Sequence, residues 1–478
     1  MGKMTKILKQ LLAAVVVSSM AISSLAGCSG SGEKKDTNTQ NAEASKKTAE
    51  DTAKEAQKEK TKIKVWARGS SADPGVNAII DKFQKAEKNI EIEYQYYGDN
   101  YANIVKMAIA AGTPPEVFEV STGLTIPELA NQDAIVPVDD LWTDDLKKQF
   151  HPDTLKQFDY LYKGKPYTIP VRISAYRLLY NKDVFKKAGL DPEKPPQTLE
   201  EMRTVAKKIT EAGKGEFYGF GLPLGVGQIW ERIIDPINIA MGNGGRYGYD
   251  KKTGKFDMEL SKKLFNYYLD LKKDGSLFPG YITLGIDPLR ANFSQGKIGM
   301  YIDGNWMVGN YAVQLKTTAN WDVAPLPVFE GSTKGKYWAE NGVAYAIGKS
   351  KNIDAAKKFY QTWITSQDLA NKFMPAPRTY NAANEESALP VSELKLQGVK
   401  GSFDTSDLEI PSIEPHKFLT LKGDDRNKVF TNLYAKSSNG DIGKELDSAI
   451  QDLNKRYDEA LEKAIADGVL TQEDLKRQ

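Results

Sequence analysis

Short strands alternate with amphipathic helices from residue 61 to the end of the chain, and this alternation constrains the fold more than any other feature. Residues 63–67 and 90–94 have the short apolar or alternating patterns of strands. The segment between them places apolar residues at helical spacing from about Pro74. A strand, a helix and a strand in this order form a βαβ unit. The sequence therefore predicts an α/β fold with mostly parallel sheets.

Further segments extend this pattern along the chain. Apolar residues at helical spacing predict helices over residues 101–111, 198–212, 259–274, 353–366 and 441–466. The second of these helices opens with Thr198 and Glu201, the residue pair of a capping box. Between the helices, the sequence predicts strands over residues 167–170, 175–180, 299–302, 321–324 and 344–347.

The first 60 residues have a different character. Residues 1–27 combine early lysines, a short apolar run and small residues, as in an export signal peptide. They end before Cys28, the single cysteine of the chain, and the segment Leu-Ala-Gly-Cys at 25–28 resembles the lipobox of bacterial lipoproteins. Residues 28–60 lack large apolar side chains, which predicts a disordered tether. We therefore expect a protein outside the cytoplasm, anchored to the outer face of the bacterial cell membrane by a lipid on Cys28.

Composition excludes several classes of function. Lys and Arg number 65 against 63 Asp and Glu, so the net charge of +2 offers no electrostatic footprint for nucleic acid. Two histidines and one cysteine leave almost nothing for a zinc or thiol site, and no nucleophile, zinc or phosphate-loop motif occurs. We therefore expect no metal, no cofactor and no nucleic-acid partner. A glycosidase built from carboxylates distant in sequence stays open, because spacing alone does not exclude it.

Several segments carry a family resemblance. They are Ala-Gly-Thr-Pro-Pro-Glu at 111–116, Gly-Lys-Pro-Tyr at 164–167, Pro-Pro-Gln-Thr at 195–198, Gly-Lys-Ile-Gly-Met at 296–300 and Gly-Asn-Trp at 304–306. Together they resemble the family 1 extracellular solute-binding proteins, the sugar-binding lipoproteins of bacterial ABC importers related to maltose-binding protein. The resemblance implies a two-lobed periplasmic-binding-protein-like fold with a hinge and an interlobe ligand cleft. Lobe one would comprise residues 61–175 plus 337–378, and lobe two residues 176–327 plus 380–478.

Sugar recognition needs aromatic rings for the apolar C–H faces and planar polar groups for the hydroxyls. The chain has seven tryptophans and 23 tyrosines, several of them beside polar residues in turns or at strand ends. Trp306 is the leading candidate, because its segment matches the ligand-facing segment of the family. Arg172 and Arg378 lie near the expected crossovers and suit a uronate or otherwise acidic oligosaccharide. The candidate ligand-binding residues are Trp66, Arg68, Arg172, Trp230, Asp303, Asn305, Trp306, Trp338, Glu340 and Arg378.

The resemblance and the residues together predict a non-enzymatic, monomeric receptor that captures a carbohydrate between two lobes and delivers it to an ABC transporter permease. Two alternatives remain at this point. One is a lipid-anchored carbohydrate-active enzyme, and the other is a sugar-sensing subunit of a signalling system.

Overall fold

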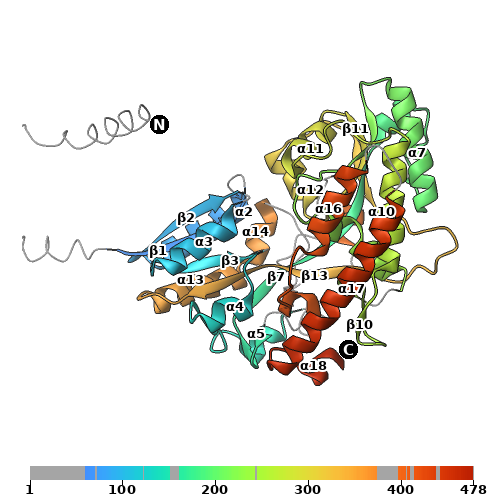
Figure 1. The fold of residues 1–478 in the computed structure, drawn as a ribbon. Coiled ribbons are helices and arrows are strands. Elements are labelled where there is room, and N and C mark those ends of the chain that lie inside the picture. Colours follow the sequence, from blue (N-terminus) through green and yellow to red (C-terminus); the bar gives the residue numbers. More distant parts are fainter. Residues whose placement is uncertain are drawn as a thin grey trace, which may run out of the picture. The chain divides into compact units, whose positions relative to one another are not determined.

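The computed structural model describes residues 60–476, apart from 70–72, 99, 122, 151–160, 243–244, 374–396, 405, 410–413 and 438–441. Residues Glu59–Gln478 form one compact unit (Figure 1). The predicted signal peptide, lipidation site Cys28 and tether lie outside the described residues, as does Arg378.

The predicted βαβ unit is confirmed at the start of this unit. It comprises β1 (Thr61–Arg68), α2 (Pro74–Ala86) and β2 (Ile90–Tyr97), and β1 runs parallel to β2 along its whole length. Helix α2 begins where the Asp73 side chain accepts a hydrogen bond of 2.7 Å from the backbone N–H of Gly75. Pro74 takes the first helical position, where its missing N–H costs nothing.

The main sheet has the strand order β2-β1-β3-β13-β7-β11-β8. Its further strands are β3 (Val117–Val120), β7 (Thr168–Asn181), β8 (Tyr218–Gly221), β11 (Ile298–Gly304) and β13 (Tyr337–Gly348). β1 is parallel to β3 and β8 to β11, but β13 and β7 run antiparallel to each other and to their outer neighbours. The expectation of mostly parallel sheets is therefore wrong, because these two long strands occupy the middle of a mixed sheet.

Strand β7 joins two strands that the sequence predicted separately. Its first half pairs with β13, ending with Ala175 opposite Ala339. From Tyr176, which lies opposite Gly304, it pairs with β11. Strand β12 (Trp321–Ala324) also pairs with this second half, whereas β4 (Ile135–Val136) and β14 (Leu408–Glu409) pair with β13. The chain thus changes sheet partners within one continuous strand.

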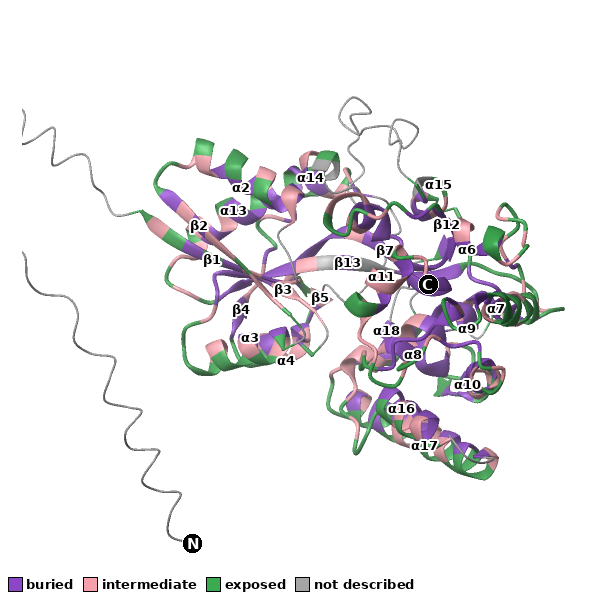
Figure 2. Ribbon diagram, turned by 90° about the horizontal axis from the view of Figure 1, so that it is seen from above, coloured by how far each residue is buried: buried purple, intermediate pink, exposed green. Residues whose placement is uncertain are grey.

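The predicted helices are confirmed as α3 (Tyr101–Ala110), α7 (Leu199–Gly213), α10 (Glu259–Lys273), α13 (Ile353–Thr365) and α17 (Gly443–Ala466). Helix α7 has the predicted capping box, in which Thr198 and Glu201 exchange side-chain and backbone hydrogen bonds. Figure 2 shows α2 and α13 on one face of β1–β3, with α3 and α4 (Ile126–Asn131) on the other.

Shorter elements complete the described chain. They are α5 (Asp144–Lys147), β5 (Leu161–Tyr162), β6 (Lys165–Pro166), α6 (Lys182–Lys187), α8 (Ile229–Ile233), α9 (Asp235–Ala240), η2 (Arg246–Gly248), β9 (Tyr249–Asp250), β10 (Lys255–Phe256), α11 (Ile286–Ser294), α12 (Met307–Gly309), η3 (Asn310–Gln314), α14 (Gln367–Phe373), α15 (Val399–Phe403), η5 (Pro415–Phe418), α16 (Arg426–Lys436) and α18 (Gln472–Lys476).

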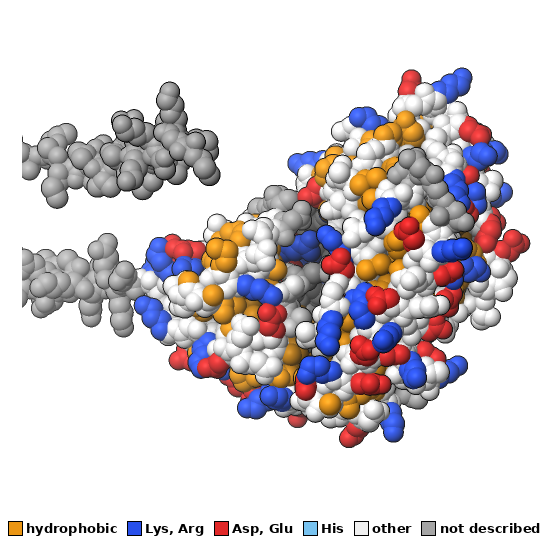
Figure 3. Space-filling view, in the orientation of Figure 1, with side chains coloured by type: hydrophobic (Ala, Val, Ile, Leu, Met, Phe, Trp, Pro, Cys, Tyr) orange, Lys and Arg blue, Asp and Glu red, His pale blue; other side chains and the backbone are white. Residues whose placement is uncertain are grey.

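The described residues form four apolar clusters, and the two largest pack against opposite ends of the β7–β13 pair. Val65, Phe83 and Trp363 belong to the core around β1–β3. Trp230 and Leu453 belong to the larger core, which includes residues of β7, α7, α10 and α17. On the face in Figure 3, Lys and Arg side chains are interspersed with Asp and Glu. Strands β7 and β13 run from one of these two cores to the other, and a site can form beside them.

Candidate functional site

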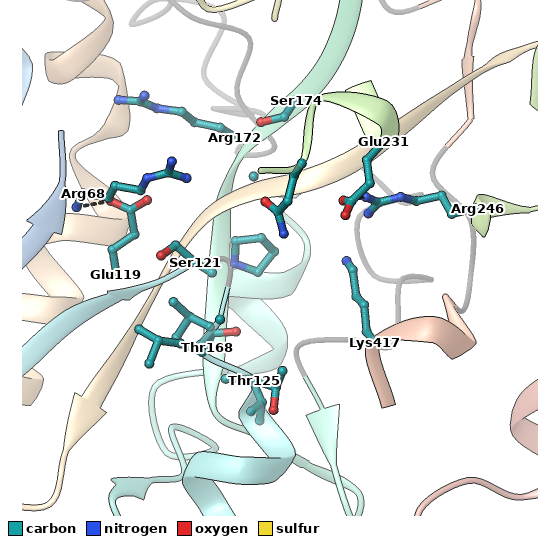
Figure 4. Close-up of a pocket in the computed structure, with 18 of the residues that line it drawn as sticks. Arg68, Glu119, Ser121, Thr125, Thr168, Arg172, Ser174, Glu231, Arg246 and Lys417 are labelled. Atoms are coloured by element: carbon teal, nitrogen blue, oxygen red, sulfur yellow. Dashed lines mark hydrogen bonds and ion pairs between the residues drawn. The ribbon is translucent and has the colours of Figure 1, made fainter. Parts of the chain in front are cut away.

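A pocket of about 530 Å³ lies where β7 and β13 run side by side. Its lining comes from these strands, the ends of β1 and β3, the start of α4, helix α8, η2, η5 and the turn after β11 (Figure 4). The lining therefore draws on segments from both sides of the β7–β13 pair. Gly342 of β13 leaves room here for Ser174 of β7, since a Cβ at Gly342 would lie 1.9 Å from the Ser174 Oγ.

The indole ring of Trp306 lies over Gly304 at this pocket. A Cβ on Gly304 would lie 2.1 Å from atoms of the ring, so the glycine is required for this placement. Tyr176 meets the same ring edge-on, with 5.8 Å between centroids. Both side chains line the pocket, one from β7 and the other from the turn after β11. Together they form an aromatic wall.

Asn305 fixes the turn that carries Trp306. Its buried side-chain amide donates a 3.1 Å hydrogen bond to the carbonyl of Ile173 and accepts one of 3.4 Å from the N–H of Ala175. Its own backbone N–H donates to the Ala175 carbonyl at 2.9 Å. The turn after β11 is thus tied to β7 at the point where β7 changes partners.

One group of charged side chains, the Arg172 cluster, consists of Arg68, Asp73, Glu119 and Arg172. Arg172 contacts Asp73 at 3.3 Å, and the Glu119 carboxylate accepts a 3.2 Å hydrogen bond from the backbone N–H of Arg68. Figure 4 shows Arg68, Glu119 and Arg172 close together at one end of the pocket. Burial raises the pKa of Glu119 to about 7, against the lowering effects of the Arg68 hydrogen bond and the two guanidinium groups. This carboxyl therefore changes charge near neutral pH.

A second group, the Arg246 cluster, lies at the other end and contains three acids and three bases. Arg246 pairs with Glu231 and, at 3.2 Å, with Glu414, which also pairs with Lys417. Behind them the fully buried Arg426 and Asp235 share two hydrogen bonds, one of 2.9 Å. Burial acts to raise the pKa of Glu414, but the charges of Lys417 and Arg246 lower it overall. Burial, with Arg246 nearby, lowers the pKa of His416, so this imidazole stays neutral.

Arg232 on α8 belongs to neither of these two charged clusters. It lines the pocket, and its guanidinium carbon lies 5.9 Å from the centroid of the Tyr176 ring. Across the described ranges it forms no ion pair within 4.0 Å. It therefore places a cation beside the aromatic wall that has no ion-pair partner among the described residues.

Four sequence-predicted site residues line the pocket: Arg68, Arg172, Asn305 and Trp306. Trp66 lies outside this lining, with its ring 5.0 Å from that of Tyr97, at a separate small hollow with Lys64 and Tyr94. Glu340 lies in β13 opposite Ser174 in backbone register.

Three other predicted residues are buried and do not line the pocket, so the structure does not bring them together with the four above. Trp230 packs against Phe265 at 5.2 Å, and its indole N–H donates to Thr431. Asp303 is fully buried, where it accepts two hydrogen bonds from Arg290. Trp338 is 1% exposed and stacks on Tyr176, and the guanidinium carbon of Arg246 lies 4.3 Å from the centroid of the Trp338 ring. Trp338 thus supports two lining residues from behind.

The sequence prediction missed several lining residues. Glu231 and Arg232 follow Trp230 directly, but neighbouring residues on a helix point about 100° apart, so the tryptophan packs inward while they reach the pocket. Hydroxyl and amide groups also line it, and no sequence motif marks them. These missed residues are Ser121, Thr125, Thr168, Ser174, Tyr176, Gln228, Glu231, Arg232, Arg246, Tyr247 and Lys417.

The model of the bacterial extracellular solute-binding protein family matches residues 66–369, which include most of the pocket-forming strands. The chain belongs to this family. A solute-binding protein of an extracellular family acts outside the cytoplasm, and the family and its relatives are binding proteins. The two-lobed α/β fold agrees with that of solved solute-binding proteins.

Three similar proteins illustrate the range of this solute-binding family. An uncharacterized ABC transporter extracellular-binding protein of Pyrococcus horikoshii is 24% identical over 94% of this chain and 96% of its own length. A sn-glycerol-3-phosphate-binding periplasmic protein of Brucella abortus is 29% identical, over 54% of this chain and 59% of its own. An ABC transporter solute-binding protein of Thermotoga lettingae, solved with α-D-tagatose, has a TM-score of 0.68 and 23% identity, covering 84% of this chain and all of its own.

Two features are absent from the described residues of this solute-binding protein. No group of three or more His, Cys, Asp or Glu residues there is arranged to hold a metal ion. None of the helices described has both the length and the apolar character that crossing a membrane requires.

Proposed function

We propose that this protein is a receptor that binds a carbohydrate in the pocket beside β7 and β13 and delivers it to an ABC transporter permease. The observation that carries the proposal is the aromatic wall of Trp306 and Tyr176 among hydroxyl, amide and charged groups. An indole face removes water from the apolar face of a sugar, which supplies affinity that hydroxyl hydrogen bonds alone do not. The tagatose complex of the Thermotoga protein, which shares the fold, supports this ligand class.

Ligand capture would use a hinge between two lobes. We assign lobe one to residues 61–175 plus 337–378 and lobe two to 176–327 plus 380–478. The change of β7 partners between Ala175 and Tyr176 supports this boundary, as do the separate cores. A sugar that contacts residues from both lobes would favour the closed form through its higher affinity for it.

A lipid on Cys28 would hold this receptor at the outer face of the membrane, with residues 28–60 as the tether. The support is the lipobox-like segment 25–28 and the apolar run before it. Cys28→Ala should release the protein into the medium or leave its precursor uncleaved. Membrane retention of a processed, unlipidated Cys28→Ala protein would contradict this anchor.

A carbohydrate-active enzyme is the competing function, since Glu119 and Glu231 both line the pocket. Glu231 accepts hydrogen bonds from Arg246, Tyr247 and Asn427, so both of its carboxylate oxygens are held by donors of the protein. A glycosidase needs two carboxyl groups that face the scissile bond, and this arrangement favours binding because it commits one of the two to the Arg246 cluster.

The deciding experiment combines a thermal-shift screen of the mature protein with product analysis. A sugar at about 100 times its Kd should add about 2.7 kcal/mol to the free energy of unfolding. Stoichiometric binding with unchanged sugar after prolonged incubation supports the receptor. Turnover of the bound sugar would establish the enzyme instead, and binding that stimulates a kinase without uptake would establish the sensing subunit.

A further inference from the structure

Cations outnumber acids around the candidate pocket. Among the described residues, its lining includes five cationic side chains but only two carboxylates, Glu119 and Glu231. The five cations are Arg68, Arg172, Arg232, Arg246 and Lys417. A pocket for a purely neutral solute gains nothing from such an excess, because each desolvated charge costs free energy unless it is paired.

Most of these cations have partners in the protein. Arg246 and Lys417 pair with Glu414, and Arg246 also pairs with Glu231. Arg172 contacts Asp73 at 3.3 Å, although its buried Nε has no hydrogen-bond partner among the described residues. Arg68 lies beside Glu119, as Figure 4 shows.

Arg232 differs from the other four. It is only partly exposed, and in the part of the chain that the structure describes no carboxylate lies within ion-pair distance of it. Its guanidinium lies 5.9 Å from the ring centroid of Tyr176, whose edge contacts Trp306. A cation with free donors therefore stands next to the surface against which a sugar ring would stack.

The shape of the Arg232 guanidinium indicates which ligand group would pair with it. Its planar fork of N–H donors matches the two oxygens of a carboxylate or the oxygens of a phosphate, and such charge-assisted pairs are stronger than neutral hydrogen bonds. A hydroxyl offers one acceptor and no charge. An anionic substituent on the stacked sugar would supply the missing partner of Arg232.

We propose that the natural ligand is an acidic carbohydrate whose anionic group, a uronate carboxylate or a sugar phosphate, pairs with Arg232 while its ring stacks on Trp306. This inference rests on the proposed carbohydrate-binding function. It assigns to Arg232 the selection for charge and to Trp306 the contact with the sugar ring.

The test is calorimetric titration of the mature protein with matched ligands. One arm compares oligogalacturonates with their methyl esters, which keep the rings and lose the charge. A second arm compares hexose phosphates with the parent hexoses, and a third uses neutral malto- and cello-oligosaccharides. Each titration is repeated with Arg232→Gln, Arg232→Lys and a control, Arg203→Gln, which removes an α7 arginine outside the pocket lining.

We expect one acidic ligand to bind more tightly than its neutral match. Arg232→Gln should lower the affinity for that acidic ligand by about 10- to 100-fold and leave the affinity for neutral ligands unchanged. Arg232→Lys should fall between the two, and Arg203→Gln should match the parent. The arm that binds distinguishes the carboxylate from the phosphate.

Two results would overturn the inference in different ways. If acidic and neutral members bind equally and Arg232→Gln changes neither, the ligand is not selected for charge, and the carbohydrate receptor stands. If no member of any arm binds to the folded parent protein, the proposed carbohydrate function fails and the inference fails with it.

Discussion

The two charged clusters at the ends of the pocket are built differently. In the Arg246 cluster three acids and three bases pair with one another, and Asp235 and Arg426 are completely buried. In the Arg172 cluster the ion pair is partly exposed, with side-chain exposures of 17% for Arg172 and 13% for Asp73. It also contains Glu119, whose raised pKa of about 7 reflects burial that its neighbours only partly offset. The Arg246 cluster therefore holds its end of the pocket in a fixed structure. The Arg172 cluster carries charges that can respond to a bound ligand or to a change of pH.

The largest effect expected is on stability, from Asp235→Asn. This substitution keeps the side-chain volume but leaves the Arg426 charge buried without its counter-ion, and breaking such a pair commonly costs about 3–5 kcal/mol. Denaturant unfolding measures the change directly. A decrease of less than about 1 kcal/mol in the free energy of unfolding would show that the Arg246 cluster does not stabilise its end of the pocket.

The next effect is on binding, from Trp306→Ala. Truncating an aromatic hot spot commonly costs about 2 kcal/mol, so the affinity for a bound sugar should fall about thirtyfold. Trp66→Ala is the matched control, because Trp66 is also half-buried but lies outside the pocket lining. If Trp306→Ala lowers Tm and still binds sugar as tightly as the parent, Trp306 only packs. Equal losses in both variants would also contradict the site assignment.

A smaller effect concerns pH and the Arg172 cluster. The pKa of Glu119 is raised from about 4.5 unfolded to about 7 folded, so between these values the folded protein keeps a proton that the unfolded chain releases. Its contribution to stability is therefore present at low pH and is lost as pH rises through this window, then stays constant above it.

Glu119→Gln tests this sign. Arg68 and Arg172 face the carboxyl, and Tyr101 and Tyr345 lie beside it. The parent should bind a uronate, which stays ionised at both values, a few-fold more tightly at pH 6 than at pH 8, because protonation of Glu119 removes a repelling charge. Glu119→Gln should bind equally at both values. A pH dependence that survives this substitution would place the titrating group elsewhere.

The smallest effect is expected from Asp73→Asn, the same chemical change as Asp235→Asn made in the other cluster. Asparagine retains an oxygen that can cap α2, so the substitution tests the Arg172 pair alone. A partly exposed ion pair contributes little, and the free energy of unfolding should fall by less than about 1 kcal/mol. A loss as large as that of Asp235→Asn would abolish the distinction between the clusters.

Local patterns predicted the helices and the βαβ unit well, because helical spacing and the Thr198–Glu201 capping box act over a few residues. The strands were harder to predict. Residues 171–174 carry a polar interruption that separated two predicted strands, yet pairing with β13 keeps β7 continuous through Ser174. The antiparallel course of β7 and β13 depends on partners more than a hundred residues away, which local patterns do not record.

Only some of the predicted site residues line the pocket, and the reason is also that local patterns do not record distant partners. Tryptophans beside polar residues marked the turn at Trp306, which lines the pocket, but the same signal selected Trp230 and Trp338, which are buried. Asp303 looked like a ligand for hydroxyls because its partner, Arg290, lies on another element, α11. Sequence composition near a position does not show which side of an element faces the pocket, and the Arg246 cluster assembles only in the folded chain.

We expect a carbohydrate to close this protein around the pocket beside β7 and β13. Small-angle X-ray scattering of the mature protein, with and without a sugar at proven saturation, tests it most directly. We expect a lower radius of gyration for the saturated parent and for Trp66→Ala, and a smaller decrease for Trp306→Ala at the same sugar concentration, because its affinity is about thirtyfold weaker. An identical radius for the free and saturated parent would contradict it.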